Sequence, residues 1–297
     1  MDISILQLFV EVMKQGSFAA VARERNIDPS SVSRAIAGLE TELGIRLFQR
    51  TTRKLSPTEA GTTYFERIAP LLEDMQQAAE FAGDISGKPK GKLRITASVA
   101  FSLKCLVPLL PQFKTLYPDL IIDLLVTDRV VDLVADRIDL AVRLGLLEDS
   151  TLIAQRLIQT HYVVCGGPGY LQDAPPLKKP SDLTNHNCLR FPLSGFNSQW
   201  IFRDSNGNIS EVPVNGDTVI SNAIALQHCA IAGMGLALLP NWLIAEDLES
   251  GALVNALPEY SVTATNFNTA AWLVYPSRAY VPLKVRVFID FLKNSMT

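Results

Sequence analysis

The spacing of apolar residues predicts three short helices within the first 44 residues. Gly16 follows the first apolar stripe as a C-terminal stop, because glycine readily adopts the left-handed conformation that ends a helix. Asp28 and Pro29 stand in the order of an N-cap and a first-turn proline, so a third helix starts there. The positions that set the three faces are Leu6, Phe9, Val10 and Met13, then Phe18, Val21, Ala22 and Arg25, then Val32, Ile36, Leu39 and Leu43.

The opposite face of the third helix is small and polar. It carries Ser30, Ser33, Arg34 and Ala37. Small side chains let a helix backbone approach another surface closely, and one arginine is long enough to reach beyond that surface. This face is therefore predicted to touch a partner.

A basic segment follows, "IRLFQRTTRKLSPTEAG", from Ile45 to Gly61. Leu47, Phe48 and Leu55 flank its polar tip, which predicts two strands and a turn, that is, a wing packed on the helices. Its cations, with no acid before Glu59, are Arg46, Arg50, Arg53 and Lys54. Ser56, Pro57 and Glu59 resemble an N-cap, a first-turn proline and a capping-box acid, so a long helix is expected to begin there. It leads to a Gly/Pro/Lys linker ending at Gly91.

From Lys92 onward, strand and helix patterns alternate. Strands are expected at "LRITAS", "IIDLLV", "DLAVRL", "HYVVCG", "CLRF" and "AAWLVYP", with a hairpin about Asn206 and Gly207. Helices are expected through Phe113, through Leu133, from Ser221 to Ile231 and over "VPLKVRVFIDFL". Alternation of this kind is typical of parallel strands with crossover helices. The C-terminal two-thirds is therefore predicted to be α/β, and its size favours two small lobes.

Composition agrees with a folded chain of more than one domain. The 297 residues are 48% hydrophobic and 19% charged, as in ordinary globular proteins. The longest apolar runs are shorter than a membrane span, and Met1 is followed by Asp2 instead of a secretory leader, so we expect a cytoplasmic protein without membrane contact. The four cysteines lack metal-ligand spacing and are expected to be buried, reduced thiols; no metal or other cofactor is predicted.

The helical pair and the wing predict contact with double-stranded DNA. In a helix-turn-helix the second helix lies in the major groove, and residues near its start reach the base edges. Serine hydroxyls suit phosphates or bases, and arginine can bind guanine through two hydrogen bonds. For Ser30 or Arg34 alone, a plain first-turn residue or a solvated cation is an equal alternative. The DNA-facing set predicted from these positions is Ser30, Ser31, Ser33, Arg34, Arg50, Arg53 and Lys54.

At this point the sequence resembles the LysR-type transcriptional regulators. The stretch from Leu6 to Gly61 is similar to the winged helix-turn-helix of that family, and "DLAVRLG", "GYL" and "AGMGLALLP" are similar to its effector domain. The resemblance implies a homodimer through the long helix, often a tetramer, and an effector domain of two lobes like those of periplasmic binding proteins. Promoter DNA, a small-molecule effector and RNA polymerase are the implied partners. The resemblance also adds Ser17 and Pro29 to the DNA-facing residues. The expected divisions are 1–57 for DNA binding, 58–91 for the linker helix and 92–297 for the effector domain, with lobe 1 about 92–161 and 267–297 and lobe 2 about 162–266.

The formal charge of −3 argues mildly against nucleic acid. The objection weakens because a dimer doubles the local cations, and phosphate binding depends on charges at the contact.

The effector site is predicted where strands end, because ligands of α/β sheets bind outside the carboxyl ends of strands. The expected residues are Ser98, Val99, Ala100, Phe101, Ser102, Thr127, Asp128, Arg143 and Leu144, facing Leu193, Trp200, Ser221 and Asn222. Phe101 as core, Arg143 in a structural ion pair and Trp200 as an anchor remain open alternatives. Two helix starts and an arginine favour an anionic or carboxylate effector, with the two aromatic residues beside an aromatic portion.

Catalysis is not predicted. His161, His186 and His228 form no HExxH pattern, and "PLSGF" around Ser194 is not a hydrolase elbow. A solute-binding α/β protein without a direct DNA role is the alternative function, and a DNA-packaging protein would not need the large α/β domain.

Overall fold

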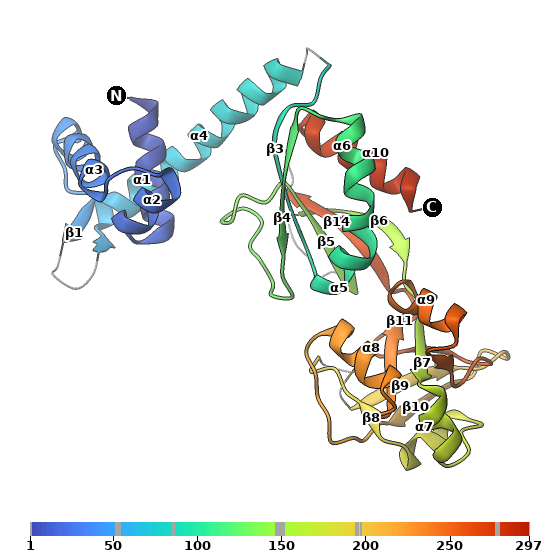
Figure 1. Ribbon diagram of the computed structural model, residues 1–297. Coiled ribbons are helices and arrows are strands. Elements are labelled where there is room, and N and C mark those ends of the chain that lie inside the picture. Colours follow the sequence, from blue (N-terminus) through green and yellow to red (C-terminus); the bar gives the residue numbers. More distant parts are fainter. Residues whose placement is uncertain are drawn as a thin grey trace. The chain divides into compact units, whose positions relative to one another are not determined.

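A computed structural model of the chain describes residues 2–50, 55–84, 87–145, 152–193, 196, 198–276 and 280–296 (Figure 1). It separates into two compact units, Met1–Lys88 and Pro89–Thr297. Within the described residues no helix combines the length and apolar character that crossing a bilayer requires.

The N-terminal unit begins with the three predicted helices, α1 (Ile3–Gln15), α2 (Phe18–Arg25) and α3 (Pro29–Leu43). Asp2, Ser17 and Asp28 are their N-caps, and each accepts a main-chain hydrogen bond with its side chain. Gly16, Asn26 and Gly44 end them in left-handed conformations. The predicted stop at Gly16 and the predicted Asp28–Pro29 start are confirmed.

The apolar faces of these helices meet in one core. Phe9, Val12, Val21, Val32 and Ile36 are buried there. Phe9 also packs edge-on against Phe48 of the wing at a centroid distance of 5.8 Å. Burial of the three stripes therefore places the polar face of α3 outward.

The predicted wing is confirmed as the antiparallel pair β1 (Phe48–Arg50) and β2 (Leu55–Pro57). The predicted start of the next helix is wrong. Ser56 and Pro57 belong to β2, and α4 (Glu59–Asp84) is preceded by Thr58, whose Oγ1 accepts from Gly61 N at 2.9 Å. Ser56 and Pro57 resembled a helix cap, but they pair with β1 and are part of the sheet.

Lobe 1 of the C-terminal unit is a sheet in the order β4-β3-β5-β14-β6. Its strands are β3 (Gly91–Ala97), β4 (Leu120–Val126), β5 (Leu140–Gly145), β6 (Leu152–Gln159) and β14 (Ala270–Pro276). As predicted, β3 pairs in parallel with β4 and with β5, while β14 is antiparallel to β5 and β6. The helix expected through Leu133 is wrong, because residues 133–137 form a turn.

Two helical segments cover the lobe 1 sheet and lie side by side in Figure 1. One begins at α5 (Val99–Phe101) and continues through a π turn (Ser102–Leu106) and a 3-10 turn (Val107–Leu109) into α6 (Leu110–Leu116). The other is α10 (Leu283–Ser295). Phe113 packs on Phe288 and Phe291 at centroid distances of 4.8 and 5.1 Å, so α10 contributes to the core of lobe 1.

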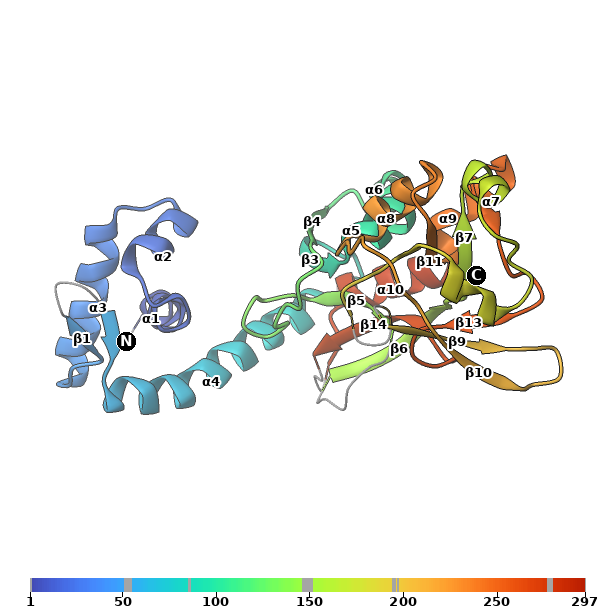
Figure 2. The same cartoon turned by 90° about the horizontal axis from the view of Figure 1, so that it is seen from below.

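Lobe 2 contains a second sheet, in the order β10-β9-β13-β7-β11-β8, with β12 also paired to β7. The predicted hairpin is confirmed, and it extends along one edge of the lobe in Figure 2. The strands are β7 (Tyr162–Gly166), β8 (Cys188–Leu189), β9 (Gln199–Arg203), β10 (Ile209–Pro213), β11 (Leu236–Pro240), β12 (Val254–Asn255) and β13 (Ser261–Thr263). The helices are α7 (Pro168–Asp173), a 3-10 turn (Pro180–Asn185), α8 (Ala223–Ile231) and α9 (Asn241–Ser250).

The chain crosses between the lobes twice. Thr160 N donates to Thr269 O, and Thr269 Oγ1 donates back to Thr160 O, both at 2.9 Å. Both threonines are buried. The two crossing segments are therefore bonded to each other where they pass between the lobes.

Candidate nucleic-acid interface and effector crevice

The start of α3 presents a polar tip to solvent. Ser30, Ser31 and Arg34 are exposed, and Ser33 is half-buried. Arg34 Nε and Nη2 donate to Ser30 O and Ser30 Oγ, both at 3.3 Å. The guanidinium therefore lies along the first turn of the helix, and releasing two long hydrogen bonds would let it extend.

Asp28 stabilises this turn. Its Oδ1 accepts from Ser30 N at 2.7 Å, and Pro29 follows as an exposed first helical residue. Hydrogen bonds from the Ser30 side chain and main chain lower the pKa of the Asp28 carboxyl, because they stabilise its charged form. The carboxylate thus serves as a cap.

A buried carboxylate that the sequence analysis did not single out joins α3 to the wing. Glu40 Oε1 accepts from Leu47 N at 2.8 Å and from Phe48 N at 3.1 Å, and Oε2 pairs with Arg46 at 3.2 Å. These bonds place the start of β1 against the C-terminal half of α3. The signal in the sequence is an acid four residues after Ile36, within the apolar stripe.

The remaining predicted DNA-facing residues are placed only in part. Ser17 is half-buried and caps α2, with its Oγ accepting from Ala20 N at 3.2 Å. The Arg50 main chain ends β1 opposite Leu55. Arg53 and Lys54 lie outside the described residues.

In the C-terminal unit, four predicted effector residues meet where lobe 1 faces lobe 2. Asp128 Oδ1 accepts from Val99 N, and Asp128 Oδ2 accepts from Asn222 Nδ2, each at 3.0 Å. Ser98 caps the same turn, with its Oγ accepting from Phe101 N at 3.4 Å. We call the group formed by Ser98, Val99, Asp128 and Asn222, where a hydrogen bond joins the two lobes, the effector crevice.

The aromatic wall expected for the effector is wrong. Trp200 is only 1% exposed and belongs to the core of lobe 2, where its Nε1 donates to Phe196 O at 3.3 Å. Phe101 is fully buried and packs edge-on against Trp242 of α9 at 5.2 Å. Ala100 is buried in a cluster otherwise formed by lobe 2 residues, and Ser102 is buried beside it. Phe101 and Ala100 therefore pack against lobe 2, and Trp200 stays within its own lobe, as the core and anchor alternatives allowed.

Arg143 is engaged within lobe 1. Its Nη2 donates to Val131 O at 2.6 Å, and burial lowers the pKa of its guanidinium. Thr127 N donates to Ala97 O at 3.0 Å, its Oγ1 accepts from Arg129 N, and Leu144 packs on the lobe 1 core. Leu193 and Ser221 are exposed on lobe 2. None of these contacts joins these residues to the four of the crevice.

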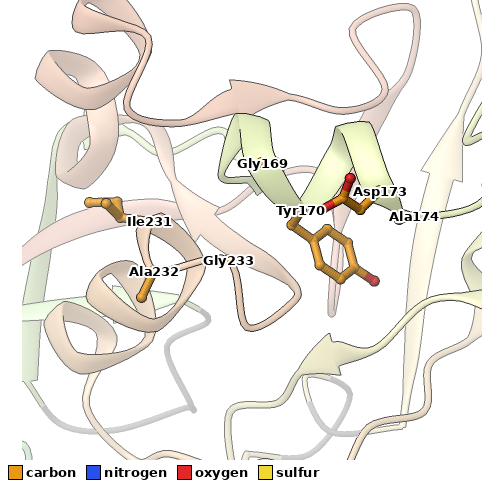
Figure 3. A pocket seen from close by; sticks show the side chains of 7 residues that line it. All are labelled: Gly169, Tyr170, Asp173, Ala174, Ile231, Ala232 and Gly233. Carbon is orange, nitrogen blue, oxygen red and sulfur yellow. The ribbon is translucent and has the colours of Figure 1, made fainter.

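A surface hollow of about 460 Å³ lies elsewhere in lobe 2, between α7 and the end of α8 (Figure 3). Its lining is Gly169, Tyr170, Asp173, Ala174, Ile231, Ala232 and Gly233, which includes no predicted effector residue. Tyr170 Oη accepts from Asn187 N at 3.0 Å, and this hydrogen bond fixes the position of the ring.

The cysteines are free thiols. Cys165 and Cys188 are buried, and Cys105 and Cys229 are half-buried. Burial raises the pKa of Cys105, Cys165 and Cys188 to about 12. No cluster of three or more His, Cys, Asp or Glu side chains suited to a metal ion occurs in the described part of the chain.

Comparison with known families divides the chain in two. Residues 3–62 match "Bacterial regulatory helix-turn-helix protein, lysR family", and residues 86–297 match "LysR substrate binding domain". The crevice therefore lies in a domain of the effector-binding type.

Relatives and solved structures agree along nearly the whole length. The regulator CrgA of Neisseria meningitidis serogroup C is 33% identical over 292 residues, covering 98% of this chain and 96% of that protein. The probable regulator LtrA of Klebsiella pneumoniae is 32% identical, covering 98% and 94%. The structure of CrgA has a TM-score of 0.61 at 31% identity, covering 100% and 99%. The full-length structure of the Vibrio cholerae virulence activator AphB, a member of the same family, has a TM-score of 0.62 at 28% identity and full coverage of both chains. This chain belongs to the LysR family of transcriptional regulators, which are DNA-binding proteins with an effector domain and are not enzymes.

Proposed function

We propose that the start of α3 reads promoter DNA in the major groove. The observation that supports this most is the exposed tip of Ser30, Ser31 and Arg34, whose arginine is held by two 3.3 Å hydrogen bonds to Ser30. Arginine extended from this turn suits the two acceptors of guanine. Pro29, Ser17 and Ser33 would lie close to the backbone, and Arg50, Arg53 and Lys54 of the wing would neutralise phosphates.

We infer that the effector is anionic and binds in the effector crevice. Two donors converge there, the Val99 main-chain NH and the Asn222 amide, and both already hold a carboxylate, that of Asp128. A ligand changes the arrangement of the lobes only by binding one arrangement better than another. The regulator would act in the cytoplasm as a dimer or tetramer through α4, with RNA polymerase as a further partner.

The DNA-reading proposal is tested by substituting Arg34. Fluorescence anisotropy would measure binding of the full chain to its own upstream DNA and to random DNA. Arg34→Ala is expected to lower the ratio of specific to random affinity about tenfold, since a good bidentate pair provides roughly 1 to 3 kcal/mol of discrimination.

The matched control is Arg156→Ala, which removes an exposed arginine of β6 in the C-terminal unit and should change neither affinity by more than about twofold. An unchanged ratio in Arg34→Ala would contradict base reading by this residue. Equal weakening on both DNAs would reassign Arg34 to phosphate contact.

A further inference from the structure

Asp128 touches both lobes with one carboxylate. Its Oδ1 accepts from the Val99 main chain in lobe 1, and its Oδ2 accepts from the Asn222 side chain in lobe 2, each at 3.0 Å. Asp128 itself follows β4, so it belongs to lobe 1. The Asp128–Asn222 bond therefore joins lobe 1 to lobe 2.

The orientation of Asn222 makes this bond specific. Asn222 Oδ1 accepts from Ile224 N and Ala225 N, both at 3.1 Å, and thereby caps α8. This network assigns the amide oxygen to α8 and leaves the amide nitrogen to donate toward Asp128. Turning the amide over would break both capping bonds, so the start of α8 is coupled to the position of the Asp128 carboxylate.

The crossing bond differs from the rest of the junction between the lobes. Phe101 against Trp242 and the paired Thr160 and Thr269 are buried contacts. Asp128 is exposed and Asn222 is half-buried, so their bond can open without exposing apolar surface. Water or another acceptor can replace the Asp128 carboxylate as the partner of Asn222. The buried contacts cannot be replaced by water in this way.

We propose that Asp128 occupies the anion position of the effector crevice in the unliganded regulator and determines which effectors enter. This inference rests on the proposed function. An effector carboxylate that accepts from Val99 N and Asn222 Nδ2 must displace Asp128, which competes as a tethered anion at high local concentration. Effectors with two anionic oxygens replace both bonds at once. A neutral ligand with a single acceptor restores only one of them.

The bridge is tested without any ligand, by hydrogen exchange and mass spectrometry on the full chain. Asp128→Asn keeps the side-chain shape but removes the charge. It also leaves a single acceptor oxygen, whereas the two bonds to Val99 N and Asn222 Nδ2 need two. Exchange is expected to rise about tenfold for Val99 and for the first amides of α8, the loss expected for a hydrogen bond to a charged group. Asp136→Asn removes an exposed carboxylate from the turn after β4 and should match the wild type.

The peptide at the start of α8 separates the bridge from a local role. An increase at Val99 alone would make Asp128 a cap within lobe 1 and overturn the proposal. Unchanged exchange in both peptides, in Asp128→Asn and in Asp128→Ala alike, would overturn it as well. Asp128→Ala, which removes both oxygens, repeats the measurement if the asparagine side chain retains both contacts.

The charge selection is tested with two probes of similar shape, benzoate and benzamidinium, by calorimetry. Asp128→Asn is expected to bind benzoate about tenfold more tightly than the wild type and Asp136→Asn, with no gain for benzamidinium. Equal benzoate affinity in all three proteins would overturn the displacement. Faster exchange combined with tighter binding of benzamidinium to the wild type would keep the bridge and reject the anionic effector of the proposed function.

Discussion

The junction of α3 with the wing depends on a single buried carboxylate. Glu40 is 5% exposed and accepts from Leu47 N and Phe48 N. Its pairing with Arg46 adds little, since that arginine side chain is 77% exposed. Glu40→Ala would leave two buried main-chain donors without their acceptor.

We expect Glu40→Ala to lower the free energy of unfolding of the N-terminal unit by about 2 to 3 kcal/mol, the cost of leaving buried donors unsatisfied. Urea unfolding of the full chain measures it. Glu66→Ala, an exposed position on α4, should stay within about 0.5 kcal/mol of the wild type. A loss of the same size in both variants would contradict the anchoring role of Glu40.

Single residues also explain why the candidate crevice was only partly predictable. Asp128 and Asn222 were predicted because they follow a strand and start a helix, and those are local signals. Trp200 and Phe101 were wrong as wall residues because sequence position does not tell which side of a sheet or helix faces the core. Trp200 alternates inward on β9, with its neighbours Gln199 and Ile201 more exposed.

At the scale of elements, the sequence predicted a helix or strand correctly where the residues that determine it are close together in the chain. The caps and stripes of α1 and α3 lie within each helix, so their sequences contain the whole signal. The start of α4 was misplaced because β1, formed by residues some distance back in the chain, pairs with Ser56 and Pro57. The strand β6, "LIAQRLIQ", was not predicted, since its leucines, glutamines and arginine favour helices and only pairing with β14 makes it a strand.

The approach of α4 to the wing depends on a glycine. A Cβ on Gly61 would stand 2.1 Å from Leu47 O, whereas a Cβ on Gly38 in α3 meets nothing within 4 Å. Gly61→Ala should destabilise the N-terminal unit by about 1 to 3 kcal/mol, as overpacking does. Gly38→Ala should stabilise it by roughly 0.5 to 1 kcal/mol, because alanine is the better helix former. Thermal unfolding of both variants checks the opposite signs, and equal signs would contradict the close approach.

At the scale of the whole molecule, buried thiols and a buried tyrosine make the stability of the C-terminal unit fall at alkaline pH. Burial raises the pKa of Cys105, Cys165, Cys188 and Tyr162 to about 12. Thiols of the unfolded chain ionise near 8.5, so the folded state holds more protons above that pH. The stability that the three thiols contribute is present below pH 8.5 and is lost as pH rises toward 12. The share of Tyr162 is lost only above about pH 10, where an unfolded tyrosine ionises.

Each thiol should contribute a slope of about −1.4 kcal/mol per pH unit above pH 9. Urea unfolding at pH 9 and pH 10 in a reducing buffer measures the total slope. Cys188→Ala should remove one thiol's contribution to the slope of unfolding free energy against pH, whatever its effect on the absolute stability. Parallel pH profiles for the variant and the wild type would show that Cys188 does not titrate differently in the two states.

The sheet order of lobe 1 also governs how the protein is made. Strand β14 lies between β5 and β6, although lobe 2 separates it from both in the chain. During synthesis all strands of lobe 2 are made before β14. Lobe 1 can fold only after β14 and the Phe288 and Phe291 side chains of α10 have also been made. A message cut short after β13 would therefore encode the strands of lobe 2 but lack the strand that stands between β5 and β6, so the lobe 1 sheet could not form.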